Sequence, residues 1–143
     1  MRKNVLTVLA ILSLGGAALS FQDDALKQSV KRGEEVYTTN CLSCHMQNGE
    51  GLEGSFPPLA KADYLTKDKT GKQAIKVVLN GLEEEITVNG KKYNMLMPAQ
   101  NYLPDQQIAD VLNYVRNSWG NKGKIITEEI GRASCRERVS TDV

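Results

Sequence analysis

Cys41-Leu42-Ser43-Cys44-His45 is the stretch of this 143-residue sequence that decides the fold. It holds two of the three cysteines in the chain and the only histidine. In a helix, side chains three residues apart lie on the same face, one turn from each other, so both thiols can act on one common group. Two cysteines this close in the chain close too short a loop to be a useful disulfide. The stretch therefore indicates a binding motif rather than a structural cross-link.

A Cys-x-x-Cys-His motif is typical of c-type haem attachment. The two thiols can each form a thioether with one vinyl group of the same porphyrin, and the imidazole of the next residue then lies beneath the iron as a ligand. Covalent attachment also keeps haem in a small domain that cannot fully enclose it. We therefore predict one covalent haem c, attached through Cys41 and Cys44, with His45 as a metal ligand.

Three other interpretations of the motif are weaker. A zinc site needs four ligands, and beyond the motif the sequence offers only Cys135 and carboxylates. A thioredoxin-like redox pair needs a βαβ context, whereas here a helical pattern precedes the motif and a glycine-rich loop follows it. A chance occurrence of the motif is disfavoured by the export signal and the methionines described below.

The first 20 residues have the pattern of a secretory signal. A positive start at Arg2 and Lys3 precedes an apolar stretch over residues 5–14, and Ala18-Leu19-Ser20 places small residues at the −3 and −1 positions of a cleavage site. We expect cleavage after Ser20 and a periplasmic mature protein. In the alternative interpretation the segment is not cleaved, and residues 5–19 anchor the protein to the membrane, although the apolar run is short for an anchor.

Residues 130–143 are excluded from the predicted domain. They show no helical or strand period, contain the isolated Cys135, and resemble the in-frame translation of a sequencing-library adapter. We expect a non-native or disordered tail that packs against nothing. The remaining domain, residues 21–129, holds 13 basic and 15 acidic side chains, and its net charge of −2 argues against a nucleic-acid-binding protein.

Hydrophobic periodicity predicts a mostly helical domain. Helices are expected over residues 23–39, 71–82 and 104–119, with Trp119 on the apolar stripe of the last one and a short helical turn over 60–65. The Asn89-Gly90 pair predicts a two-residue hairpin turn within residues 86–93. Gly33 costs its helix about 1 kcal/mol relative to alanine, which suggests that another element approaches closely there. Asp23 and Asp24 suit the positive end of the first helix dipole.

A haem iron held by His45 has an opposite face, and the chain has no second histidine for it. A methionine thioether is then the natural ligand. Met46 is adjacent to His45 and cannot reach round the ring, and Met1 leaves with the signal. Met95 and Met97 remain, both in a non-helical loop, and either could instead fill a gap in the core.

With its motifs in this order, the chain over residues 23–121 resembles the small monohaem class I cytochromes c of bacteria. The stretches that carry the resemblance are Gly33-Glu34-Glu35-Val36-Tyr37, the Cys41–His45 motif, Gly49-Glu50-Gly51, Phe56-Pro57-Pro58-Leu59, Met97-Pro98-Ala99 and residues 108–120. The resemblance implies an all-α fold around one haem, with a small hairpin insertion, in which the first and last helices cross and Gly33 contacts the region of Tyr114.

The resemblance also assigns two further site residues. It implies that Met97, which precedes Pro98, is the second metal ligand. It implies that a carbonyl of Pro57-Pro58, preferably that of Pro57, accepts the N–H of His45 and fixes the ring.

These expectations describe an electron carrier rather than an enzyme. Its partners are expected to be transient redox proteins, such as a dehydrogenase, a reductase or an oxidase, because electron-transfer encounters are small and brief. Two alternatives remain. The chain could be a haem enzyme or gas sensor with a sixth position that opens, as in a peroxidase, or the cytochrome subunit of a larger oxidoreductase.

Overall fold

The computed structural model describes residues 2–129, so the predicted tail lies outside the described residues. Within these residues, five helices and one two-stranded hairpin follow in the order α1 (Arg2–Asn40), α2 (Leu42–His45), α3 (Asp63–Lys67), α4 (Lys72–Asn80), β1 (Ile86–Val88), β2 (Lys91–Tyr93) and α5 (Asp105–Asn117). The expected all-α fold with a small hairpin is confirmed. Among the described residues, no helix is long and apolar enough to cross a membrane.

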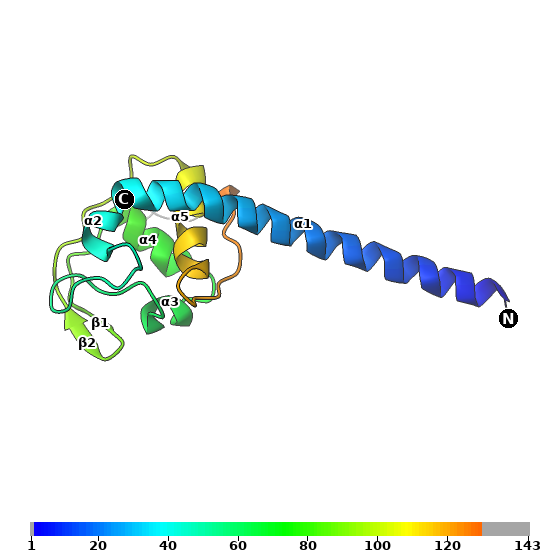
Figure 1. Ribbon diagram of the computed structural model, residues 1–143, viewed down its shortest axis with the longest axis horizontal. Helices are drawn as coiled ribbons and strands as arrows, with labels where there is room; N and C mark the ends of the chain where they lie inside the picture. Colours follow the sequence, from blue (N-terminus) through cyan, green and yellow to red (C-terminus); the bar gives the residue numbers. More distant parts are fainter. Residues whose placement is uncertain (1, 130–143) are drawn as a thin grey trace, which may run out of the picture.

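Helix α1 begins earlier than the sequence predicts. It runs without a break from Arg2 through the expected start at Asp23, and its first part extends well beyond the rest of the domain (Figure 1). The segment before Asp23 contains no proline and is rich in leucine and alanine, which favour helix. Asp23 and Asp24 therefore lie within α1, and the expectation that they lie at the positive end of the first helix is wrong when residues 2–20 are present.

The contact between α1 and α5 organises the domain, and Figure 1 shows α5 crossing α1. Gly33 makes this contact possible, since a Cβ atom added there would lie 1.9 Å from the Asp110 backbone oxygen and 2.9 Å from the Cβ of Tyr114. Beside the glycine, Arg32 binds the buried Asp110 carboxylate through both Nε and Nη2, each at 2.8 Å. The predicted close approach at Gly33, and its contact with the region of Tyr114, are confirmed.

Gly33→Ala is expected to destabilise the protein by about 2 kcal/mol. A methyl group between two packed backbones costs about 3 kcal/mol, the upper end of the usual range, because the added Cβ would meet the Asp110 backbone directly. The gain in helix propensity offsets about 1 kcal/mol of this cost. Denaturant unfolding of the holoprotein measures the difference. Glu35→Ala, an exposed change on the same helix, is the control and should stay within about 0.5 kcal/mol of wild type. Equal stability of the two variants would contradict the close packing.

The main core lies between α1, α4 and α5, and a smaller cluster lies beneath the hairpin. Fully or almost fully buried members of the main core include Tyr37, Ile75 and Ile108. The smaller cluster consists of Ala62, Val88 and Tyr93. The hairpin itself follows its prediction, because Asn89 and Gly90 both have positive φ angles, of 51° and 78°, as a two-residue turn requires.

The bounds of α3 and α4 differ from the sequence prediction. The expected turn at 60–65 is displaced to Asp63–Lys67, because the backbone N–H groups of Ala60 and Lys61 are bound by Gly49 and Asn121 instead. Helix α4 occupies only Lys72–Asn80, with glycines of positive φ at both ends.

Helix α5 stops at Asn117, before Trp119, which has a positive φ angle of 53° and is therefore not on the helix. The indole still packs on the main core, with its ring centroid 5.2 Å from that of Tyr114 and 5.2 Å from that of Tyr37. The residue thus contributes to the α1–α5 contact from the loop that follows the helix.

Candidate haem-binding site

The Cys-x-x-Cys-His motif lies on the one-turn helix α2, directly after α1. Cys41 is its N-cap, and the His45 backbone N–H donates to the Cys41 carbonyl at 3.0 Å, which closes the turn. Both thiols are free and half-buried, and both border the same cavity. Burial, with a smaller contribution from Cys44, raises the pKa of the Cys41 thiol to about 11, so this thiol is protonated at neutral pH.

His45 is oriented by the carbonyl group of Pro57. Its Nδ1 lies 3.1 Å from the Pro57 oxygen, which can only accept, so the proton of the neutral ring is on Nδ1. Burial lowers the pKa of His45 more than this hydrogen bond raises it, which favours the neutral ring. The Nε2 lone pair is then available, and no hydrogen bond reaches it in the described part of the chain.

The loop that carries Pro57 is held close to the motif by Gly51. This glycine has a φ angle of 63° and donates its N–H to the His45 carbonyl at 3.1 Å. A Cβ atom at this position would lie 2.4 Å from the Phe56 oxygen and 2.7 Å from the Pro57 carbonyl carbon. Only a residue without a side chain lets the two loops approach closely enough for the His45–Pro57 contact.

Both methionines of the 95–98 loop border the same cavity, but they differ in exposure. The Met95 side chain is 51% exposed, whereas Met97 is partly buried. The backbone of Met97 is fixed by an isolated antiparallel bridge, in which its N–H and C=O each bond to Leu82 at 2.9 Å. Gly81 allows this bridge, because a Cβ there would lie 2.5 Å from the Met97 oxygen.

Apolar side chains from almost every element complete the cavity. Its wall includes Leu59, Leu65, Ala74, Val78, Val88, Leu103, Val111, Leu112 and Val115. Within the part of the chain that the structure describes, Glu84 is the only carboxylate that lines the cavity. The donor set and the surface fit a large flat apolar group that carries a metal: two thiols for attachment, one imidazole lone pair, a thioether and a dry wall. In contrast, no three or more His, Cys, Asp or Glu side chains of residues 2–129 are arranged to hold a bare metal ion.

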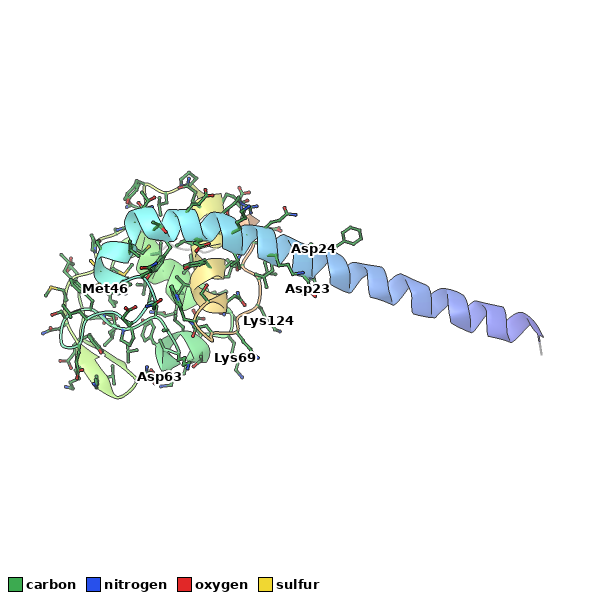
Figure 2. All side chains as sticks on the ribbon, viewed as in Figure 1. Asp23, Asp24, Met46, Asp63, Lys69 and Lys124 are labelled. Carbon is green, nitrogen blue, oxygen red and sulfur yellow. The ribbon has the colours of Figure 1, made fainter. Side chains whose placement is uncertain are left out.

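Two residues support the site in ways that the sequence analysis missed. Leu82 was predicted to lie on the helix over residues 71–82, whereas it lies after the end of α4 and pairs through its backbone with Met97. Tyr37 was not predicted to support the site, yet its hydroxyl group donates to the Met46 carbonyl at 2.6 Å and so holds the sharp turn after α2. Met46 has a φ angle of 62° there and lies at the end of α2, where Figure 2 labels it.

The sequence model of the family Cytochrome c matches residues 30–119, which include the motif, the hairpin and α5. The chain belongs to the cytochrome c family. A cytochrome c carries covalently bound haem c and transfers electrons, and this chain is a small monohaem class I member with the expected fold. The cavity that both cysteines and His45 line is called the haem cavity below.

Similar proteins include a cytochrome c-552 and cytochrome c subunits of two dehydrogenases. Cytochrome c-552 of Thermus thermophilus is 40% identical over 121 residues, which cover 83% of this chain and 75% of that protein. The cytochrome c subunit of a quinone alcohol dehydrogenase from Gluconobacter oxydans is 39% identical over 90 residues, 62% of this chain and 18% of that subunit. The gluconate 2-dehydrogenase cytochrome c subunit of Pantoea cypripedii is 32% identical over 123 residues, 81% of this chain and 28% of that subunit.

Proposed function

We propose that this cytochrome c is an exported electron carrier with haem attached at Cys41 and Cys44. His45 and Met97 are the proposed iron ligands, and both line the same cavity. The observation that carries the proposal is the fixed His45 ring, whose Nδ1 lies 3.1 Å from Pro57 O and whose Nε2 has no other partner among the described residues. The haem supplies one-electron exchange between ferrous and ferric iron.

The protein contributes rigidity and a dry environment to this exchange. Pro57 holds the imidazole in one orientation, and the Leu82 bridge holds the backbone of Met97. Ligands that hardly move when the iron changes its charge keep the reorganisation cost of electron transfer low. A methionine opposite a histidine also raises the reduction potential.

The similarity to dehydrogenase subunits supports a second candidate function, in which the chain is itself a subunit of a larger enzyme. Two relatives are cytochrome c subunits of a quinone alcohol dehydrogenase and of a gluconate 2-dehydrogenase. In this alternative the chain passes electrons as one subunit of a larger oxidoreductase, rather than by transient encounters with a dehydrogenase, reductase or oxidase. Size-exclusion chromatography of the natively expressed protein distinguishes a free carrier from a stable complex.

The ligand proposal is tested by the spectrum of the purified holoprotein. Reduced-minus-oxidised spectra should give a haem c signature, and the ferric protein should have the near-infrared band of a methionine–iron bond. A ferric protein that lacks this band and binds azide without mutation would favour the haem enzyme or gas sensor with an open sixth position.

Export is tested by the mature N-terminus. The Ala18-Leu19-Ser20 pattern predicts Phe21 as the first residue of the protein recovered from the periplasm. N-terminal sequencing or intact mass measurement checks this. Retention of residues 1–20 in a membrane fraction would instead support the anchored form, with residues 5–19 in the bilayer.

A further inference from the structure

A second cavity, distinct from the haem cavity, is bordered by most of the unpaired positive charge of the domain. Five of the 13 basic side chains of residues 21–129 line it, namely Lys69, Lys72, Arg116, Lys122 and Lys124. Among the described residues, Asp68 is its only acidic lining residue, and Leu65 is the only one that it shares with the haem cavity. The cavity has a volume of about 600 Å³. This concentration of charge stands out in a domain whose net charge is −2.

Arg116 forms the buried floor of this cavity. Its side chain is only 5% exposed, and its Nη2 donates to the carbonyl oxygens of Asp68 and Lys69 at 2.9 and 3.2 Å. Its Nη1 is the one buried side-chain nitrogen or oxygen without a hydrogen-bond partner in the part of the chain that the structure describes. A buried donor without an acceptor costs about 1–3 kcal/mol, and more when it is charged.

Two glycines leave room for the guanidinium group. A Cβ atom at Gly71 would lie 2.4 Å from Nη1, and one at Gly123 would lie 3.1 Å from Nε. The side chain is thus fixed between two backbone segments, at a place where a larger residue on either side would displace it. Burial lowers the pKa of Arg116 because the charged guanidinium group is removed from water. An anion beside this group would offset part of that cost.

Asp68 is the one carboxylate beside this cluster among the described lining residues, and its charge partly offsets the effect of burial on the pKa of Arg116. The Asp68 oxygens already accept from the backbone N–H groups of Gly71 and Ala74, both at 2.9 Å, and from the Thr70 hydroxyl group at 3.2 Å. None of the four lysines forms an ion pair within residues 2–129, whereas Lys67, their neighbour in the chain, is paired with Asp63. All four lysines are exposed.

We propose that this cavity binds a phosphate-type oxyanion, with Arg116 as the buried anchor and the lysines as its rim. Guanidinium and ammonium groups are the side chains that recognise phosphate oxygens, and an oxyanion in this cavity would place a negative charge beside Arg116, which is buried and has a donor without a partner among the described residues. The phosphate belongs either to a soluble phosphate compound or to the headgroup of an anionic phospholipid. Figure 2 shows Lys69 and Lys124 on the side of the domain from which α1 extends, opposite Met46 at the end of α2.

The test uses the ferric holoprotein at low ionic strength, where charge interactions are least screened. Inorganic pyrophosphate is titrated by calorimetry, and vesicles of phosphatidylcholine with and without phosphatidylglycerol are used in sedimentation. Binding of pyrophosphate identifies a site for soluble phosphate compounds. Binding of phosphatidylglycerol vesicles alone identifies a lipid headgroup site. If neither probe binds, the proposal is wrong.

A pair of charge-matched variants shows whether binding occurs in this cavity. The triple variant Lys69→Gln/Lys122→Gln/Lys124→Gln should weaken binding at least about tenfold, because charge-assisted contacts are lost. Lys27→Gln/Lys31→Gln/Lys76→Gln removes the same charge from residues outside the cavity and should change binding less than about twofold at fixed salt. An equal loss in both variants would mean attraction by overall charge alone and would overturn the proposal.

The role of Arg116 is tested separately. Arg116→Lys keeps the charge but removes the fork of donors, so it should also weaken binding, with the haem spectrum and the reduction potential unchanged. If this buried change prevents folding, the lysine variants still decide. Because these variants lie outside the haem cavity, their outcome does not depend on whether the proposed iron ligands are correct.

Discussion

Serine in place of Cys41 or Cys44 will remove most of the holoprotein from cells that export and mature this cytochrome c. The two thiols lie one turn apart on α2 and border the same cavity, so each is placed to bond one vinyl group of a single haem. Serine cannot form the thioether. Haem-stained gels of periplasmic extracts, normalised to total protein, measure the loss, and acid–acetone extraction should leave haem on the wild-type chain.

Ser43→Ala is the matched control for these variants. Ser43 is exposed in the middle of the same helix and does not line the cavity, and its hydroxyl group makes only a 3.8 Å contact with the Cys44 sulfur. Its replacement leaves both thiols in place, so holoprotein yield should stay at the wild-type level. Haem that leaves the wild-type protein in acid–acetone, or a serine variant with normal covalent haem, would contradict attachment at these two residues.

The loss is expected to be large because the cavity is part of the core. Side chains of α4 and α5, such as Ala74, Leu112 and Val115, belong both to the main core and to the cavity wall. Without haem these apolar surfaces face an empty space, and a domain of about 100 residues has little other core to compensate. A group bound only by the folded state stabilises it, so the apoprotein should be unfolded and degraded.

Local signals in the sequence were sufficient for much of this fold. The Cys41–His45 motif determined the cofactor, Asn89-Gly90 determined the hairpin turn, and the isolated Gly33 predicted a helix contact that the structure has with Asp110 and Tyr114. In each case a residue type is costly or rare unless one particular conformation or contact requires it. Such residues are informative without any knowledge of the rest of the chain.

What the sequence did not predict depends on residues that are distant in the chain. Leu82 leaves α4 because its backbone pairs with Met97. The position of α3 depends on Asn121, whose side chain accepts from Lys61 at 2.9 Å and donates to the Leu59 carbonyl at 2.8 Å. Hydrophobic periodicity contains no information on such pairings, so it extended two helices too far and displaced a third.

The basic cavity escaped the sequence analysis for a related reason. Its five cationic side chains come from three separate segments, around Lys69, Arg116 and Lys122, and none of these segments is unusual in composition. The net charge of the domain does not reveal them, because 14 of the 15 acidic residues within residues 21–129 lie outside the lining of this cavity. Arg116 also falls at the end of an amphipathic helix, where a basic residue is ordinarily explained by the helix dipole.

Met97→Ala will open the sixth position of the iron, whereas Met95→Ala will leave it closed. The two methionines differ in how their backbones are held. Only Met97 of the two has paired backbone hydrogen bonds to Leu82, and only Met97 is followed by a proline, Pro98. Proline restricts the residue before it to an extended backbone, which keeps a weak thioether bond from exchanging with water. Met95, at 51% exposure, has neither constraint.

The measurements are the near-infrared methionine–iron band, carbon monoxide or azide binding, and the reduction potential. Met97→Ala should lose the band, bind both small ligands and lower the potential by more than about 60 mV, a tenfold change in a one-electron equilibrium. Met97→Leu nearly keeps the volume of the side chain, so its loss of the band separates ligation from packing. Met95→Leu should retain the band. If the two positions behave in reverse, Met95 is the ligand, and if neither change affects the band, an iron with another sixth ligand or an open position replaces the His45/Met97 proposal.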